Sequence, residues 1–202
     1  MIAIIDYDAG NLKSVEKALL RVGAESVVVT RDPAVIMQAD KVILPGVGAF
    51  GEAMEKLESF GLVKTIHEVV ASGKPFLGIC LGLQLLFEYS DEKEGCKGLS
   101  ILKGGIKRIP DTPGLKVPHM GWNSLKVTPG AKLFANLPEE PYVYFVHSYY
   151  LQAEDPEIVA ATTEYGVTIH ASVEKDNVFA CQFHPEKSGE TGLAILKNFV
   201  EL

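Results

Sequence analysis

A cysteine flanked by glycines is the pattern in this chain that most clearly predicts chemistry. Cys80 has Gly78 and Gly82 two residues away on either side, which is the thiol counterpart of the G-x-S-x-G turn that raises a serine nucleophile above a sheet. The glycines allow the close packing of a sharp strand-to-helix turn, and the helix N-terminus that follows favours a thiolate. Free cysteines are also among the most buried residue types, so an inert thiol in a non-enzymatic binding module is the alternative.

The sequence His184-Pro185-Glu186 predicts a base for this thiol and a carboxylate to orient it. Pro185 favours an extended backbone at His184, and residues two apart in an extended chain point to the same side. The Glu186 carboxylate can then fix the imidazole tautomer and stabilise the imidazolium, as in other nucleophilic triads. We assign no chemistry to the other histidines, which fit surface, strand, structural or interface positions: His67, His119, His147 and His170.

A glycine-rich segment that begins at Gly46 supports two interpretations. Its G-x-G-x-x-G spacing matches a dinucleotide-binding turn, with Glu68 near the place of the acidic ribose ligand, and would indicate a nucleotide-dependent oxidoreductase. Here, however, the motif follows the third expected strand instead of opening the fold, and Glu68 lies within a helical pattern. We favour a turn in which Gly46 and Gly48 aim a backbone N–H at the cysteine, forming an oxyanion hole with the N–H of Leu81.

The elements that would position these residues alternate between strand and helix in the first half of the chain. Short strands that are apolar throughout indicate a parallel sheet covered on both faces, so we predict an α/β, doubly wound fold. The expected strands are residues 2–5, 26–30, 42–44 and 75–79. The expected helices begin near Leu12, Pro33, Gly51, Leu62 and Leu81, and the last of them is expected to be amphipathic.

The second half, from residue 95 to 177, has little helical periodicity and shows short β-rich runs separated by turn residues. We expect these runs to extend the largely parallel sheet with antiparallel or mixed strands: residues 99–109, 122–127, 142–150, 158–163, 167–173 and 178–183. A final helix is expected over residues 190–200. No repeat, low-complexity tract or linker divides the sequence, so residues 1–202 are expected to form a single domain.

The composition limits the class of partner and the compartment. The formal net charge of −7 argues against nucleic acid or an anionic membrane as a main partner. The apolar runs are shorter than the ~18 residues of a transmembrane helix, and the N-terminus lacks the features of a signal peptide. The three cysteines form no C-x-x-C motif or His/Cys cluster, so we expect reduced thiols in the cytoplasm, with no metal site and no cofactor.

The sequences PGVGAFGEAM, GICLGLQLLFE and FHPEKS together resemble the class I glutamine amidotransferases, whose glutaminase domain carries a Cys-His-Glu triad. The sequences DYDAGNLKSV, VPHMGWN and YFVHSYY are similar to the glutaminase subunits of imidazole glycerol phosphate synthase, an enzyme of histidine biosynthesis. The resemblance covers essentially the whole chain. A sister glutaminase of pyridoxal phosphate synthesis shares the triad, but HMGWN is not expected there.

The resemblance implies hydrolysis of L-glutamine to L-glutamate and ammonia through a γ-glutamyl thioester on Cys80, with His184 and Glu186 completing the triad. The oxyanion hole of the family corresponds to Val47, Gly48 and Leu81. The family positions that bind glutamine correspond to Gly46, Gly48, Gln84, Ser148 and Tyr149. The glycines of the turn would allow the peptide reorientation that often activates this hole.

The resemblance also implies a heterodimer with a (β/α)8-barrel cyclase subunit, which consumes the ammonia and makes imidazole glycerol phosphate and AICAR. The family positions near the ammonia exit and the partner surface correspond to Asn11, Met120, Trp122, Tyr144 and Lys187. Trp122 suits an interface hot spot, but a core position at the start of a strand fits its sequence context about equally well.

Overall fold

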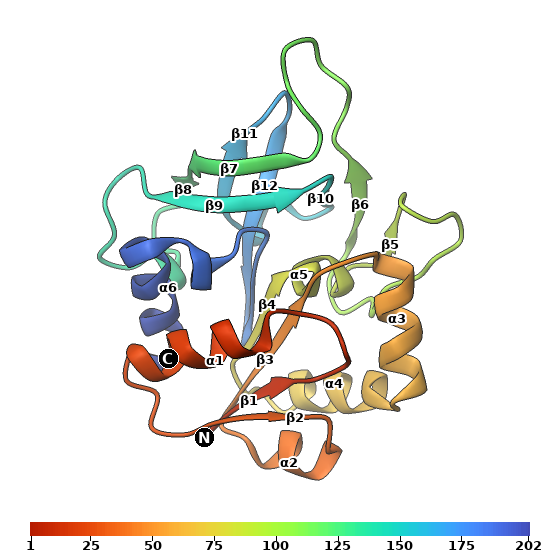
Figure 1. Ribbon diagram of the computed structural model, residues 1–202, viewed down its shortest axis with the longest axis vertical. Helices are drawn as coiled ribbons and strands as arrows, with labels where there is room; N and C mark the ends of the chain where they lie inside the picture. Colours follow the sequence, from red (N-terminus) through yellow and green to blue (C-terminus); the bar gives the residue numbers. More distant parts are fainter.

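The computed structural model describes residues 1–202 and contains an eight-stranded central sheet with the order β2-β1-β3-β4-β13-β12-β11-β8 (Figure 1). Its strands are β1 (Ile2–Ile5), β2 (Val27–Thr30), β3 (Lys41–Gly46), β4 (Phe76–Cys80), β8 (Lys126–Val127), β11 (Val159–Glu164), β12 (Thr168–Lys175) and β13 (Val178–Cys181). The strands from β2 to β13 run parallel, and β12, β11 and β8 continue in antiparallel pairs. This arrangement confirms the predicted α/β, doubly wound fold.

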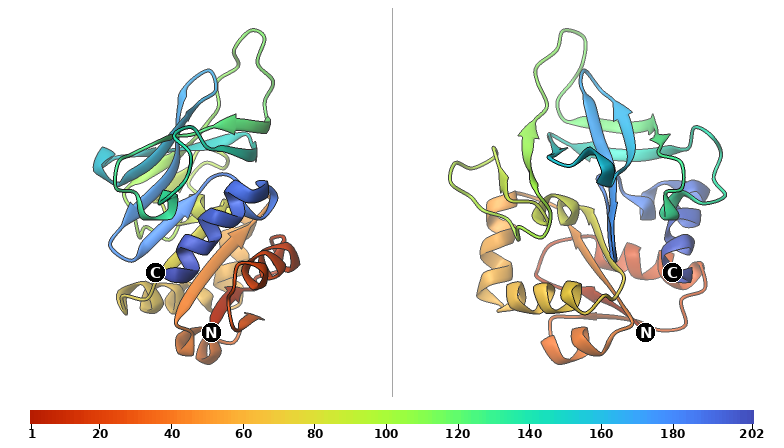
Figure 2. Two further views of the ribbon diagram at one scale, coloured as in Figure 1. Left: turned by 90° about the vertical axis from the view of Figure 1, so that its left-hand side faces the viewer. Right: turned by 180° about the vertical axis from the view of Figure 1, so that it is seen from behind.

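Helices cover both faces of the central sheet, as the uniformly apolar strands predict (Figure 2). One face carries α1 (Leu12–Arg21) and α6 (Gly189–Glu201), and the other carries α2 (Pro33–Gln38), α3 (Phe50–Ser59), α4 (Leu62–Ala71) and α5 (Leu81–Leu85). Alternate strand residues enter two cores, with Ile2 and Ile4 in the core of α1 and α6 and Ala3 and Ile5 in the other. No helix combines the length and the apolar character needed to cross a membrane.

The remaining strands form two smaller sheets, so the expectation that every run of the second half extends the central sheet is wrong. One sheet contains β10 (Tyr149–Ala153), β6 (Gly104–Arg108) and β5 (Tyr89–Ser90), and the other pairs β7 (His119–Ser124) with β9 (Tyr142–His147). The expected run 142–150 breaks at Ser148, and its two halves therefore join different sheets. Residues 99–102 are not a strand, because the Leu99 N–H bonds to the carbonyl of Leu85 at 2.8 Å.

The carboxyl ends of β3, β4 and β13 lie side by side at one edge of the central sheet. Gly46 is opposite Cys80, and Cys181 is opposite Ile79. This edge is where open α/β sheets bind ligands. The β7–β9 sheet adjoins this edge of the central sheet. The N–H of His184, just beyond β13, donates to the carbonyl of Tyr144 in β9 at 3.0 Å. Three short 3-10 helices complete the chain: η1 (Lys132–Phe134), η2 (Pro156–Ile158) and η3 (Pro185–Lys187).

Candidate active site

Cys80 is held at a strained turn between β4 and α5. Its backbone angles are φ 56° and ψ −109°, a positive-φ conformation that a residue with a side chain rarely adopts. A Cβ on Gly82 would lie 1.8 Å from the carbonyl oxygen of Leu44, and one on Gly78 would lie 2.8 Å from the carbonyl oxygen of Gly82. Both flanking positions therefore require glycine, which confirms the close backbone packing expected of this elbow.

The helix after the elbow differs from the one expected. It ends at Leu85 and all of its residues are buried, so the expectation of an amphipathic helix from Leu81 is wrong. The reason is its position: α5 packs against both β3 and α3, and the chain then turns so that Tyr89 and Ser90 can pair with β6. A helix this short aligns few peptide dipoles, so on its own it offers limited stabilisation to a thiolate.

His184 and Glu186 form the hydrogen-bonded pair that the sequence predicts. His184 Nδ1 lies 2.9 Å from Glu186 Oε1, and both side chains are buried. The backbone of His184 is extended, as Pro185 favours, but the next three residues form η3. The carboxylate therefore reaches the imidazole across a tight turn and not along a strand. Ser188 fixes this turn, because its hydroxyl donates to the His184 carbonyl at 2.6 Å and accepts from the Tyr144 N–H at 2.9 Å.

The surroundings of His184 favour its protonated form. Burial disfavours the imidazolium, but the adjacent Cys80 and Glu186 outweigh burial and raise the pKa of His184 to about 10. Its Nε2 is buried without a hydrogen-bond partner. One imidazole nitrogen is thus held by the carboxylate, and the other is unengaged beside the thiol. Lys187, which follows Glu186 in η3, is exposed to solvent, unlike the two buried triad side chains before it.

Cys80, Gln84 and His184 lie around one cavity of about 350 Å³. The rest of its wall consists of Val47, Gly48, Leu81, Glu92, Pro118, Val146, His147, Ser148 and Tyr149. Among the predicted catalytic, oxyanion-hole and substrate-binding residues, two are not part of the wall. Gly46 is the last residue of β3, and Glu186 contacts the wall residue His184. No group of three or more His, Cys, Asp or Glu side chains is placed to hold a metal ion.

The glycine-rich turn after β3 borders the cavity through Val47 and Gly48. Gly48 has a φ of +100°, which favours glycine. The N–H of Phe50, the first residue of α3, donates to Glu92 Oε2 at 2.7 Å. The helix N-terminus that a pyrophosphate would need is therefore already occupied by a carboxylate, and this counts against the dinucleotide interpretation.

Gln84 belongs to a chain of side-chain amides. Its Nε2 donates to the Tyr149 carbonyl at 3.1 Å and to Gln182 Oε1 at 3.0 Å. The Nε2 of Gln182 in turn lies 3.8 Å from Cys80 Sγ. Because both N–H bonds of Gln84 are used within the protein, only its carbonyl oxygen is left to face a ligand.

His119 and His147 form a buried, neutral pair on the inner face of the β7–β9 sheet. His147 Nδ1 is 2.8 Å from the Tyr149 carbonyl, and His119 Nδ1 is 3.0 Å from His147 Nε2. Burial lowers the pKa of His147 to about 3 and that of His119 to about 4. Since a carbonyl only accepts, His147 donates from Nδ1 and accepts at Nε2 from its partner. The pair anchors the backbone at Tyr149, which suits a structural role.

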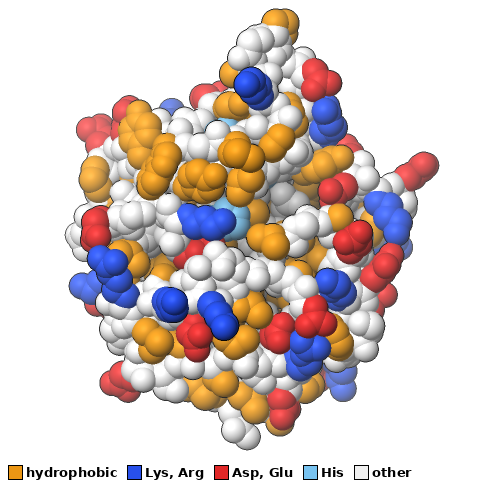
Figure 3. Space-filling model, in the orientation of Figure 1, with side chains coloured by type: hydrophobic (Ala, Val, Ile, Leu, Met, Phe, Trp, Pro, Cys, Tyr) orange, Lys and Arg blue, Asp and Glu red, His pale blue; other side chains and the backbone are white.

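The outer face of the same sheet is an exposed apolar surface (Figure 3). We call it the apolar face; it consists of Met120, Trp122, Tyr142, Tyr144 and Val146. Met120 and Trp122 are 62% and 55% exposed, so the tryptophan lies on the surface and not in the core. The Trp122 and Tyr144 rings meet edge to face, with centroids 6.2 Å apart. Val146 also lines the cavity, so the apolar face is continuous with the site.

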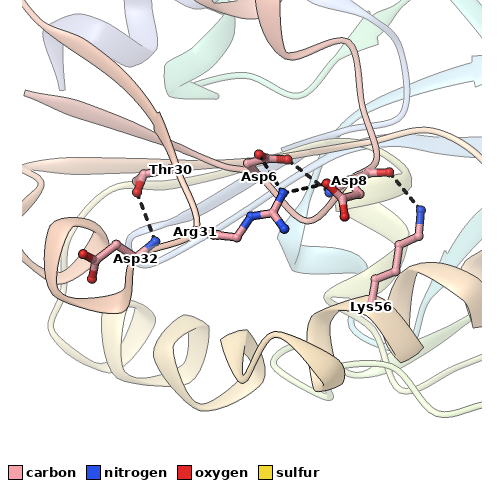
Figure 4. A network of polar contacts seen from close by, with 6 residues as sticks. All are labelled: Asp6, Asp8, Thr30, Arg31, Asp32 and Lys56. Atoms are coloured by element: carbon pink, nitrogen blue, oxygen red, sulfur yellow. Dashed lines mark hydrogen bonds and ion pairs between the residues drawn. The ribbon is translucent and has the colours of Figure 1, made fainter.

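Asn11 lies just before α1, at the end of a loop that polar contacts hold in place (Figure 4). Arg31 donates to Asp6 at 3.0 Å and to Asp8 at 2.6 Å. Lys56 donates to the backbone carbonyl of Asp8 at 2.9 Å. These contacts tie the segment between β1 and α1, which ends at Asn11, to the loop after β2 and to α3.

Comparison with known proteins agrees with this geometry. The model of the class-I glutamine amidotransferase family matches residues 3–202. The chain belongs to this family. It is 55% identical to the imidazole glycerol phosphate synthase subunit HisH of Thermosynechococcus vestitus, over 100% of this chain and 96% of that protein. It is 52% identical to the protein of the same name from Methanothermobacter thermautotrophicus, over 100% of this chain and 98% of that protein.

Solved structures show that this amidotransferase shares its fold with more distant proteins. A crystal structure described as a glutamine amidotransferase superimposes with a TM-score of 0.76 at 18% identity, covering 100% of both chains. A chain of PurLQS from Thermotoga maritima gives 0.74 at 22% identity, covering 99% of this chain and 97% of that one. At such identities the likeness concerns the fold alone.

Three residues of the site are given no role by the sequence analysis: Gln182 and Glu92, which lie outside its motifs, and Ser188, which ends the FHPEKS sequence. Gln182 has a weak signal, because it is a polar residue between an apolar strand and His184, where strand alternation directs it inward. Glu92 lies in the loop after β5, and only the folded structure brings its carboxylate to α3. Ser188 reads as an ordinary helix start, yet its hydroxyl joins the histidine turn to β9.

Proposed function

We propose that this chain is the glutaminase subunit of an imidazole glycerol phosphate synthase and hydrolyses L-glutamine to L-glutamate and ammonia. One observation carries the proposal: the His184 imidazole, 2.9 Å from the Glu186 carboxylate, lies with Cys80 at one cavity. Nucleophile, base and orienting carboxylate are the parts that cysteine-dependent acyl transfer needs. The HisH relatives, matched over the full chain, support the assignment. Residues 1–202 then act as one glutaminase domain.

In the first half of the proposed reaction, the Cys80 thiolate attacks the side-chain amide carbon of glutamine and a C–S bond forms. The N–H groups of Val47 and Leu81, with Gly48 shaping the turn, hold the oxyanion that results. The His184 imidazolium gives its proton to the amide nitrogen as the C–N bond breaks. Ammonia leaves, and a γ-glutamyl thioester remains on Cys80.

In the second half, water hydrolyses the thioester. His184, now neutral, takes a proton from the water as its oxygen attacks the thioester carbon. The C–S bond breaks, glutamate leaves, and Cys80 returns as a thiolate beside an imidazolium. Glu186 stabilises that imidazolium in both halves and keeps Nε2 directed at the reacting atoms. The proposal involves no metal and no cofactor.

The cavity wall provides groups that match the ends of a glutamine molecule. The Glu92 carboxylate suits the α-ammonium group of the substrate. The Gln84 carbonyl oxygen can accept from the side-chain amide or from the ammonium. Gly48, Ser148 and Tyr149 line the same cavity, and we assign the α-carboxylate to their backbone groups. Gly46, which lies outside the wall, takes no direct part in this binding.

We propose that the ammonia passes directly to a (β/α)8-barrel cyclase subunit that binds the apolar face, giving a heterodimer that makes imidazole glycerol phosphate and AICAR. Direct transfer is needed because ammonia released to neutral water is protonated and no longer nucleophilic. Val146 connects the face to the cavity, Trp122 and Tyr144 supply aromatic anchors, and Asn11 and Lys187 extend the contact. The cytoplasm is the proposed compartment, where the free cysteines stay reduced.

The test is an assay of the chain with and without a co-expressed barrel subunit and its nucleotide substrate. The proposal predicts that glutamate forms fastest in the complete system, in one-to-one ratio with the ring product. Glutamate formation that is absent from the complex, or that never matches the ring product, would overturn it. Saturable dinucleotide binding that is lost in Gly48→Val would favour an oxidoreductase instead.

A further inference from the structure

Gln182 lies behind the cavity, between the nucleophile and the substrate-facing glutamine. It is fully buried, at 0% exposure, and it follows the last residue of β13. Its backbone N–H donates to the Ala171 carbonyl at 2.8 Å, which fixes it to the neighbouring strand. Its side chain does not line the cavity, so it can act on Cys80 without touching the substrate.

The orientation of the side-chain amides of Gln84 and Gln182 follows from the Tyr149 carbonyl, to which Gln84 is hydrogen-bonded. The Tyr149 carbonyl can only accept, so Gln84 must turn its nitrogen toward it, at 3.1 Å. That same nitrogen faces Gln182 at 3.0 Å, and the atom of Gln182 that meets it must therefore be the oxygen. The remaining nitrogen of Gln182 is then the atom 3.8 Å from Cys80 Sγ. The Tyr149 carbonyl, acting through Gln84 and Gln182, thus determines that Cys80 Sγ faces a hydrogen-bond donor.

A donor at this position has a chemical consequence. A thiolate in a buried site loses hydration, and a hydrogen bond to the charged form replaces part of it. His184 supplies charge on the other side of Cys80, but its proton must be given up during the reaction. The amide of Gln182 cannot lose a proton, so its hydrogen bond is available at every step in which the sulfur carries charge, including the departure of glutamate.

We propose that Gln182 is a further residue of the reaction, which holds the Cys80 sulfur as a thiolate through its side-chain N–H and is itself oriented by Gln84. The inference rests on the proposed role of Cys80 as nucleophile. It assigns to Gln182 an effect on the chemical steps, and not on substrate affinity, because the side chain lies outside the cavity wall.

The experiment compares Gln182→Met, which removes the donor, with Gln182→Glu, which keeps the shape and the acceptor for Gln84 but turns a carboxylate toward the sulfur. The alkylation rate of Cys80 by iodoacetamide is followed in the full chain by peptide mass spectrometry, with Cys96 as internal standard. At neutral pH we expect the Cys80 rate to fall about tenfold in Gln182→Met, the lower end for a hydrogen bond to a charged group, and further in Gln182→Glu. In both variants, the difference from the wild-type alkylation rate of Cys80 should become smaller at alkaline pH.

A second readout and a control separate this effect from a loss of structure. In the glutaminase assay, kcat of Gln182→Met should fall about tenfold while KM changes little. Ser172→Ala is the matched control, because it removes a buried 2.7 Å hydrogen bond from the adjacent strand to the Ala180 carbonyl, a bond in which Cys80 takes no part. Unchanged alkylation in both Gln182 variants, or an equal loss in Ser172→Ala, would overturn the inference. Full glutaminase activity in Cys80→Ala would instead overturn the proposed function.

Discussion

His184 Nδ1 lies 2.9 Å from Glu186 Oε1, and the two side chains are almost completely buried. The short distance within a buried turn assigns the tautomer, because a carboxylate accepts and Nδ1 must therefore carry a proton. Nε2 is the nitrogen left for the thiol. The contact between His184 and Glu186 thus sets both the charged partner of the imidazole and the nitrogen that carries its proton.

The Glu186→Gln variant should form glutamate about 10²–10⁴-fold more slowly, since the amide lacks the negative charge that stabilises the imidazolium and can present a donor to Nδ1. The measurement is kcat at saturating glutamine in the complex with the barrel subunit. Glu186→Asp is the matched control, because it keeps the carboxylate charge and only shortens the side chain by one methylene group. Wild-type kcat in the Gln variant would contradict the role given to the carboxylate.

The free energy of unfolding of the isolated chain should be greatest near pH 6.5. As pH falls below that value, unfolded His119 and His147 take up protons that the folded chain accepts only at about 4 and about 3, so stability is lost. As pH rises above it, unfolded His184 gives up a proton that the folded chain keeps until about 10, so stability is lost again. Each group contributes a slope of at most about 1.4 kcal/mol per pH unit.

Urea unfolding at a series of pH values checks this profile. His119→Gln should reduce the slope on the acid side, and Glu186→Gln should reduce it on the alkaline side. His67→Gln, at an exposed position of α4, is the control and should alter neither. A profile in which His119→Gln and His67→Gln behave alike on the acid side would contradict the burial of the histidine pair.

Gly82 in the elbow and Gly51 in α3 should respond in opposite ways to replacement by alanine. Gly82→Ala places a Cβ 1.8 Å from the Leu44 carbonyl oxygen, in backbone that cannot move aside, and should cost about 3 kcal/mol or more of the free energy of unfolding. Gly51→Ala approaches the flexible Lys93 side chain at 3.0 Å and lies at an ordinary contact distance of 3.6 Å from Cys96 Sγ, so better helix propensity should stabilise α3 by up to about 1 kcal/mol. Urea midpoints measure both, and equal destabilisation would refute the packing argument.

Trp122→Ala should weaken binding of the barrel subunit by about 2 kcal/mol, roughly 30-fold, as for an aromatic hot spot. The free energy of unfolding of the isolated chain should change by less than about 0.5 kcal/mol, since the side chain is surface-exposed. Leu20→Ala, an exposed apolar truncation on α1, is the control for binding. Equal affinities of the Trp122 and Leu20 variants, measured by titration calorimetry, would place the interface elsewhere.

The triad and its elbow could be predicted from the sequence because each depends on neighbours in the chain. Gly78 and Gly82 bracket Cys80, and Pro185 joins His184 to Glu186. The parallel core was equally accessible, since strands apolar throughout indicate cover on both faces. The sequence predicts these features because the contacts that form them are between residues close together in the chain.

The parts that could not be predicted depend on contacts between distant segments. Gln182 and Gln84 are 98 residues apart in the chain, and nothing in either neighbourhood marks their pairing. The sequence does not predict the two small sheets, because β-rich runs do not specify their partners. β9 and β10 are separated by Ser148 alone, yet they join different sheets. The sequence does not decide whether the Trp122 side chain faces the core or the solvent, because a residue at the start of a strand can face either.

The most direct test of the central claim is the rate of glutamate formation by Cys80→Ala, compared with Cys96→Ala, in the complex with the barrel subunit and its nucleotide substrate. Both variants remove one thiol, but only Cys80 lies at the cavity with His184. We predict that Cys80→Ala forms no glutamate above the uncatalysed background and that Cys96→Ala keeps wild-type activity. Glutamate formation by Cys80→Ala at the rate of Cys96→Ala would contradict a thioester mechanism at this site.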